Sequence, residues 1–217
     1  MNVQFARRME NVQPSAIREL LRLGADPSII SFGGGYPDAS IFPLEQLNAV
    51  YEEAIARNGM ASTAEDVLIL QGAQQGLDLT AKLLIDRGDI IITENPTFLG
   101  ALIAFNPYEP RYATVRIGEN GMDMEDLERV LLATKNAKLL YTVPDFQNPT
   151  GVTMSEERRR RLIELANRFN LIILEDTPYR EIRYQGKSLP TLKSLDTEGR
   201  VIFVGSFSKI LAPGLRL

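Results

Sequence analysis

Residues 201–216 read Val-Ile-Phe-Val-Gly-Ser-Phe-Ser-Lys-Ile-Leu-Ala-Pro-Gly-Leu-Arg and carry the strongest signal for the fold. The apolar run Val201 to Val204 predicts a buried strand, which ends at Gly205. Lys209 therefore follows a strand end, where ligands bind in sheets flanked by helices. Among apolar neighbours the charged form of this lysine is disfavoured, so its amine becomes a nucleophile that forms imines with aldehydes.

The residues around Lys209 suit a ligand that also carries a phosphate. Ser206 and Ser208 supply hydroxyl groups and Arg216 supplies a guanidinium. The alternative is a lysine that extends from a loop into solvent, as most lysines do. The serines and the arginine near Lys209 favour the ligand-binding interpretation.

The composition excludes several classes of chemistry. The 217 residues include no histidine and no cysteine, which excludes a Ser-His-Asp triad, a thiol nucleophile and a thiolate zinc site. No metal site is expected, and proton transfer must use Lys, Tyr or a carboxylate. The net charge of −4 gives no general attraction to nucleic acid or anionic membranes, and we see no membrane-spanning run or signal peptide. The sequence thus predicts a cytoplasmic protein.

From residue 64 onward, β-branched or leucine-rich runs alternate with amphipathic segments. This alternation predicts an α/β fold with a mostly parallel sheet and helices on both faces. We expect an N-terminal arm with helices over residues 1–60 and one α/β domain over residues 61–217. The expected strands are Val67–Leu70, Ile90–Thr93, Tyr112–Ile117, Leu139–Val143, Leu171–Leu174 and Val201–Val204. The expected helices are 14–23, 42–58, Ala73–Ile85, Phe98–Phe105, Met124–Leu132 and Ser155–Phe169.

Polar groups and glycines follow the first two expected strands. Gly72, Ala73 and Gln74 begin a helix, whose free N–H groups make a natural phosphate cradle. Phe98 follows the next strand, where its ring is placed to cover a flat heterocycle. An ordinary glycine at a helix start and ordinary core packing of Phe98 are the alternatives.

The later strands end in stronger motifs. Asn148 lies in a Pro- and Gly-bounded turn that orients its amide toward a ligand oxygen, which the phenol of Tyr179 is able to share. Within the Glu175-Asp176 pair, a carboxylate either caps a following helix or holds a proton on a pyridine nitrogen. The four consecutive arginines 158–161 are expected on a solvated helix surface, paired with acids.

The segments Pro144–Gly151, Glu175–Tyr179 and Ser206–Arg216, in this order, resemble the fold-type I pyridoxal-phosphate aminotransferases of class I/II. That group includes 2-aminoadipate and multi-substrate aminotransferases and the catalytic half of MocR-type regulators. The resemblance covers nearly the whole chain. It implies the large-domain fold of pyridoxal-phosphate-dependent transferases, pyridoxal 5'-phosphate as cofactor, amino acid and 2-oxo acid substrates, and a homodimer.

The resemblance also implies roles for individual residues. Lys209 would form the internal aldimine and act in catalysis with Asp176, which would pair with the pyridinium, and Tyr179. The remaining implied contacts are Asn148 and Tyr179 on the ring hydroxyl, Phe98 on the ring, Gly72, Ala73, Gln74, Ser206, Ser208 and Arg216 on the phosphate, and Gly34, Gly35 and Asn148 by the substrate.

Two features depart from the family pattern. Family members continue beyond the Gly-Leu-Arg segment into another strand and a small C-terminal domain whose arginine holds the substrate carboxylate, whereas this sequence stops at Leu217. A tyrosine-containing, glycine-rich segment is also missing between Met60 and Ala61. We expect a shortened aminotransferase, incomplete at the C-terminus of its fold. A non-catalytic cofactor-sensing module and another fold-type I reaction, such as that of a lyase or decarboxylase, are the alternatives.

Overall fold

A six-stranded sheet forms the centre of the protein, with strand order β3-β2-β1-β4-β5-β6. This computed structural model describes residues 4–11, 45, 49, 52, 53, 56, 59, 62–134 and 136–210. The pairs β1–β2, β1–β4, β4–β5 and β5–β6 are parallel, and the short β3 is antiparallel to β2. The strands are β1 (Ile90–Asn95), β2 (Arg111–Gly118), β3 (Gly121–Met122), β4 (Ala137–Thr142), β5 (Ile172–Asp176) and β6 (Val201–Val204).

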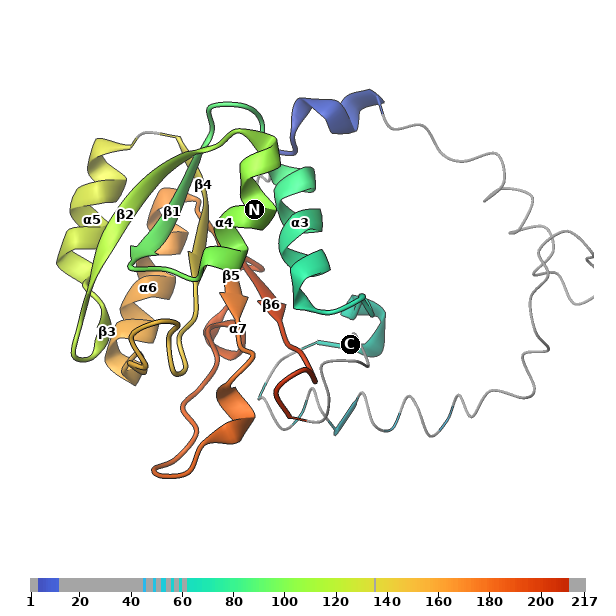
Figure 1. The fold of residues 1–217 in the computed structure, drawn as a ribbon, viewed down its shortest axis with the longest axis vertical. Coiled ribbons are helices and arrows are strands. Elements are labelled where there is room, and N and C mark those ends of the chain that lie inside the picture. Colours follow the sequence, from blue (N-terminus) through green and yellow to red (C-terminus); the bar gives the residue numbers. More distant parts are fainter. Residues whose placement is uncertain are drawn as a thin grey trace, which may run out of the picture.

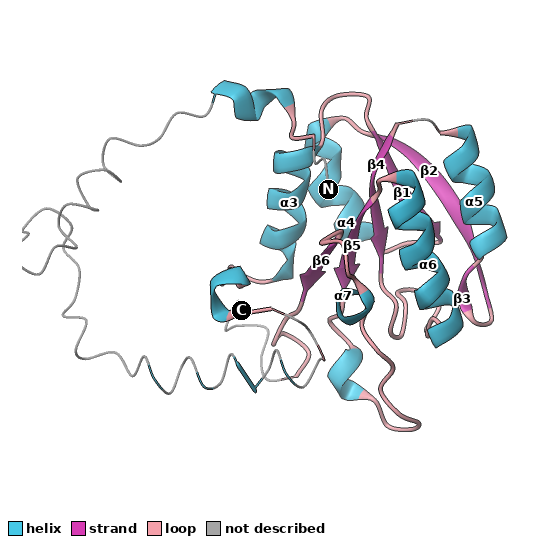
Figure 2. Ribbon diagram, turned by 180° about the vertical axis from the view of Figure 1, so that it is seen from behind, coloured by secondary structure: helices cyan, strands magenta, loops and turns pink. Residues whose placement is uncertain are grey.

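Helices cover both faces of the sheet, as the sequence predicts. Helices α3 (Ala73–Leu84) and α4 (Leu99–Phe105) lie on the face toward the viewer in Figure 1. Helices α5 (Met124–Ala133), α6 (Glu156–Phe169) and the short α7 (Leu192–Leu195) cover the other face, which Figure 2 shows in front. The 3-10 turns are η1 (Arg7–Asn11), η3 (Ala64–Asp66), η4 (Asn106–Tyr108) and η5 (Arg180–Ile182).

The strands contribute side chains to two hydrophobic cores, one on each face of the sheet, because successive side chains of a strand point to opposite faces. One core combines α3 and α4 with Leu139 and Tyr141 of β4 and Leu174 of β5. The other combines α5, α6 and α7 with Leu140 of β4 and Ile173 of β5. A sheet buried on both faces explains why its strands are apolar almost throughout.

Helix α6 begins and ends as the sequence predicts. The Ser155 hydroxyl accepts a hydrogen bond from the Arg158 N–H, which caps the first turn, and Glu156 and Glu157 lie in that turn. The helix ends at Asn170, whose φ of 53° lies in the left-handed region. Residues 45, 49, 52, 53 and 56 are helical, in agreement with the expected helix 42–58. The expected helix 14–23 lies outside the described residues.

The predicted strand Val67–Leu70 is wrong. These residues are in no strand, and Leu68 and Ile69 are 73% and 59% exposed. An apolar, β-branched run forms a strand only where another strand accepts its backbone hydrogen bonds, and within the described residues this run has no such partner. Among all the residues that the structure describes, no helix is both long and apolar enough to cross a bilayer.

Candidate functional site

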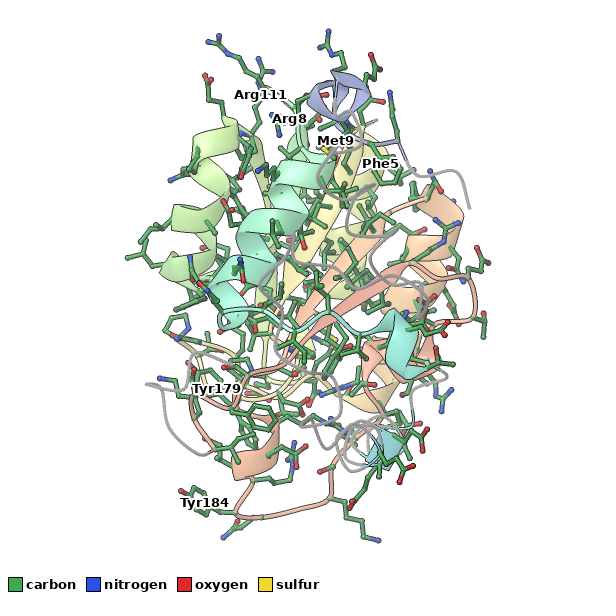
Figure 3. All side chains as sticks on the ribbon, turned by 90° about the vertical axis from the view of Figure 1, so that its right-hand side faces the viewer. Phe5, Arg8, Met9, Arg111, Tyr179 and Tyr184 are labelled. Carbon is green, nitrogen blue, oxygen red and sulfur yellow. The ribbon has the colours of Figure 1, made fainter. Side chains whose placement is uncertain are left out.

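The candidate site lies where the carboxyl ends of β1, β4, β5 and β6 meet. The chain runs from β1 outward to β2 and later returns to β4 on the other side of β1, so the order of strands reverses between β1 and β4. Ligands of open α/β sheets bind at such switch points. Tyr179 lies at this end of the molecule, whereas Arg8 and Met9 lie at the opposite end (Figure 3).

The two acids that end β5 face opposite sides of the sheet and have different partners. Glu175 accepts hydrogen bonds from the backbone N–H groups of Leu192 and Lys193, at 2.8 and 2.9 Å, and so caps α7. Asp176 instead accepts a 2.8 Å hydrogen bond from the Tyr141 hydroxyl through Oδ2. The two roles predicted for a carboxylate in this pair thus belong to different residues: Glu175 binds the first N–H groups of α7, and Asp176 faces the candidate site.

One oxygen of Asp176 has no partner among the residues that the structure describes. The residue is only 3% exposed, and its buried Oδ1 accepts no hydrogen bond within the described residues. Burial raises the pKa of Asp176 to about 6, while the hydrogen bond from Tyr141 acts in the opposite direction. A buried, unpaired carboxylate oxygen is costly unless a ligand supplies a donor, so Oδ1 marks a position for an N–H group.

Asn148 and Tyr179 come together as the sequence predicts. The Asn148 side-chain amide donates to the Tyr179 hydroxyl at 3.1 Å, although 31 residues separate them. Gln147 anchors the turn, because its Nε2 donates to the Pro96 carbonyl at 2.9 Å and to Glu94 Oε2 at 3.2 Å. The turn after β4 is therefore tied to the loop after β1 and to the loop after β5.

Glu94 is a buried acid at this edge that the sequence does not single out. Besides Gln147, the Thr142 hydroxyl and the Val143 N–H donate to its carboxylate, at 2.7 and 3.3 Å. Burial raises its pKa to about 7, although these hydrogen bonds favour the ionised form. Glu94 and Gln147 together brace the switch point between β1 and β4.

The residues that the sequence predicts to bind a phosphate lie in the first turn of α3 and in the loop after β6. Gly72, with φ 78°, precedes α3 and makes no side-chain cap, and within this turn the Gln75 N–H donates to the Gly72 carbonyl at 3.1 Å. A Cβ placed on Gly76, one turn later, would lie 3.5 Å from the Val204 side chain, which puts this end of α3 next to the end of β6. There the Ser206 hydroxyl donates to Ser208 Oγ at 2.9 Å.

The remaining predicted residues are placed as follows. Phe98 is half-buried at the start of α4, where its ring covers Gly100 closely enough to leave no space for a Cβ. Gln74 uses its amide nitrogen to donate to the Gly100 carbonyl. Lys209 lies in the turn after β6 and is exposed, so the expectation of apolar surroundings for it is wrong. Gly34, Gly35 and Arg216 lie outside the described residues.

A buried cluster of charges beneath the site was not predicted. Asp145 and Arg159 are both 0% exposed and form a bidentate pair, with distances of 3.0 and 3.3 Å. Arg180 and Arg183, from the loop after β5, also donate to Asp145.

The expectation of a solvated surface for residues 158–161 holds for Arg160 but is wrong for Arg159. Helical spacing contains the signal, because Arg159 shares a face with the buried Leu162, Ile163 and Ala166.

The fold defines an α/β protein with a mostly parallel sheet, and the buried acid Asp176 and the Asn148–Tyr179 pair lie at the carboxyl ends of its strands. The family model described as aminotransferase class I and II matches residues 35–217. The chain therefore belongs to the class I and II aminotransferases.

Individual relatives agree with this membership. The aromatic-amino-acid aminotransferase 1 of Thermococcus litoralis is 38% identical over 98% of this chain and 59% of its own length, and the 2-aminoadipate transaminase of Thermus thermophilus is 36% identical over 98% and 60%. The crystal structure of Pyrococcus horikoshii kynurenine aminotransferase, in complex with PMP, matches with a TM-score of 0.68 at 39% identity, over 98% of this chain and 60% of that one. Transcriptional regulators also match, at 32% identity or less.

The chain spans about 60% of the length of the three aminotransferases named above. The alignment with the Thermococcus litoralis protein runs over 245 residues, more than the 217 of this chain, so that relative has internal residues that this chain lacks. The sequence predicts an internal shortening of this kind between Met60 and Ala61.

Proposed function

We propose that this chain binds pyridoxal 5'-phosphate and serves as the cofactor-binding domain of an aminotransferase, which moves an amino group from an amino acid to a 2-oxo acid. The proposal is carried by Asp176 Oδ1, a buried acceptor at the carboxyl edge of the sheet for which the described residues provide no donor. Membership of the aminotransferase family, and a relative whose structure contains PMP, support the same assignment.

The residues at the edge fit this cofactor. Asp176 Oδ1 would accept the ring N–H, and the Asn148–Tyr179 pair would hold the ring hydroxyl. The first turn of α3 and the hydroxyls of Ser206 and Ser208 would bind the phosphate, which combines N–H groups with short hydroxyl donors. Arg216 would add its guanidinium, Phe98 would cover the ring, and Gly34 and Gly35 would lie by the substrate.

Lys209 would hold the cofactor covalently. Its Nζ is the nucleophile that would hold the cofactor through its aldehyde group, with loss of one water, and that a substrate amine would replace. When bound, the cofactor supplies an electron-poor ring that accepts the electron pair left at the substrate Cα. The Lys209 amine, once free, would act as the base that takes the substrate Cα proton. The amino group passes to a second 2-oxo acid in the reverse sequence, so no external oxidant is needed.

Intact-mass measurement tests the covalent attachment. The protein is incubated with pyridoxal 5'-phosphate and reduced with borohydride, in parallel with Lys209→Ala and the control Lys187→Ala, which removes an exposed lysine from another loop. We expect one stable adduct in the wild type and in Lys187→Ala, and none in Lys209→Ala. An adduct that persists in Lys209→Ala would refute the assignment.

Product analysis then separates the reaction classes. The protein is mixed with pyridoxal 5'-phosphate, an amino acid and a 2-oxo acid, and the mixture is assayed for the new 2-oxo acid, ammonia and carbon dioxide. A new 2-oxo acid without the two gases supports aminotransfer. Ammonia or carbon dioxide indicates a lyase or decarboxylase, and cofactor binding without turnover indicates a sensing module.

We further propose that the protein is a cytoplasmic homodimer. Leu68 and Ile69, and Leu99 and Ile103 on the outer side of α4, are all more than half exposed, and exposed apolar groups of this kind are typical of interaction surfaces. Light scattering after size-exclusion chromatography tests the dimer, and a mass of 24.2 kDa at micromolar concentration would contradict it.

A further inference from the structure

Tyr141 connects the hydrophobic core to the acid of the candidate site. It is fully buried in β4, and the edge of its ring meets Phe105 of α4 with ring centroids 5.7 Å apart and an interplanar angle of 76°. Its hydroxyl donates to Asp176 Oδ2 at 2.8 Å. Because the ring is enclosed by the core, the position of the hydroxyl is fixed before any ligand arrives.

In this hydrogen bond Tyr141 is the donor and Asp176 is the acceptor. Burial, and then the negative charge of Asp176, raise the pKa of Tyr141 well above its usual value of 10, so the phenol stays protonated and donates. The acceptor is Oδ2, which leaves Oδ1 as the oxygen without a partner among the described residues. The two oxygens of Asp176 are therefore distinguished by the protein itself.

We propose that Tyr141 is a positioning residue that occupies Oδ2 of Asp176, turns Oδ1 toward the cofactor ring nitrogen, and keeps the carboxylate ionised. This inference rests on the proposed function. The physical reason is that a hydrogen bond to an ionised carboxylate stabilises that form over the protonated one. Without the phenol, Asp176 would take up a proton more readily and would lose its ability to accept the ring N–H.

Two other titratable groups face this pair, namely Glu94 and Tyr179. Burial raises the pKa of Glu94 to about 7, close enough to that of Asp176 for the two titrations to overlap. Isotope labelling of aspartate alone removes the Glu94 signal from the measurement. An Asp176→Asn variant assigns the Asp176 resonance.

The first test needs no cofactor. We would follow the carboxyl carbon of Asp176 by NMR as a function of pH in the wild type, in Tyr141→Phe and in the matched control Tyr108→Phe. The control also removes a phenol–carboxylate hydrogen bond, the 2.9 Å contact from Tyr108 to Asp78, but outside the site. We expect the Asp176 midpoint to rise by about one pH unit in Tyr141→Phe and to stay unchanged in Tyr108→Phe. An unmoved or lowered midpoint in Tyr141→Phe overturns the proposal.

A second measurement on the wild type covers the case in which Tyr141→Phe fails to fold. With tyrosine labelled at Cζ, the Tyr141 resonance should shift with the midpoint of Asp176, because the phenol senses the charge that it binds. A Tyr141 resonance that does not respond at that midpoint overturns the proposal.

Cofactor binding then tests the functional consequence. We expect Tyr141→Phe to bind pyridoxal 5'-phosphate about twofold more weakly than the wild type at pH 7, because a one-unit rise of the midpoint roughly halves the ionised fraction of Asp176 there, and the difference to disappear at pH 8.5, where Asp176 ionises without help. Equal affinity at pH 7 contradicts the positioning role. If the wild type itself binds no cofactor, the proposed function fails, and the two titrations still decide whether Tyr141 controls Asp176.

Discussion

Replacing Asp145 by Asn tests the buried charge cluster beneath the site. Asn keeps the shape of the side chain, so no cavity forms, but it removes the one negative charge that Arg159, Arg180 and Arg183 share. Arg159 is fully buried and cannot turn to solvent. Removal of one partner from a buried ion pair typically costs about 3–5 kcal/mol. We therefore expect the free energy of unfolding to fall by about this amount.

Glu128→Gln is the matched control for this change. Glu128 also binds two arginines, at 2.9 and 2.6 Å, but these arginines are 43% and 59% exposed. Water screens such pairs, and each contributes about 0.2–1 kcal/mol. Urea denaturation followed by circular dichroism would compare the variants, with equal slopes of the unfolding free energy required for the comparison. The reasoning is refuted if Asp145→Asn costs no more than Glu128→Gln.

Two more predictions concern buried acids and glycine. Glu94→Gln should flatten the pH dependence of the unfolding free energy. In the folded wild type Glu94 keeps its proton up to a pKa of about 7, whereas in the unfolded chain it loses the proton near pH 4.5. The resulting stabilisation is therefore fully present below pH 4.5 and disappears as the pH rises through 7. Urea denaturation at pH 5 and pH 7 measures this change, and the prediction is contradicted if the unfolding free energy of Glu94→Gln changes between these pH values as much as that of the wild type. Gly121→Ala should destabilise by more than Gly88→Ala in the same assay, because both have positive φ but only at Gly121 would the new Cβ lie 2.7 Å from Met154 Cα. Equal losses would show that the clash is relieved at no cost.

The sequence predicts those elements whose patterns match their surroundings. Strands β1, β4, β5 and β6 are apolar runs between helical segments, and they lie in a parallel sheet as expected. Val67–Leu70 has the same pattern but forms no strand, because a strand also depends on a neighbour that no local pattern specifies. The pattern identifies what a run is able to form, and the partner decides whether it forms.

The candidate site was predictable where function requires polar groups at strand ends. Asn148, Asp176 and Tyr179 follow that rule, and the first and last of these are in contact. Tyr141 lies within a strand, and its contact with Asp176 depends on the register that places Tyr141 opposite Leu174. The contact joins residues 35 positions apart, so the periodicity of either strand alone does not contain it.

The adjacent acids at the end of β5 act as a marker of strand alignment. A slip of β5 by one position would exchange their sides, so that Glu175 would lose the N–H groups of Leu192 and Lys193 and would enter the core beside Tyr141. Each acid would then lose the hydrogen bonds that it makes in its own location. A single pair of neighbouring residues therefore penalises misfolded alignments while supplying one group for architecture and the other for chemistry.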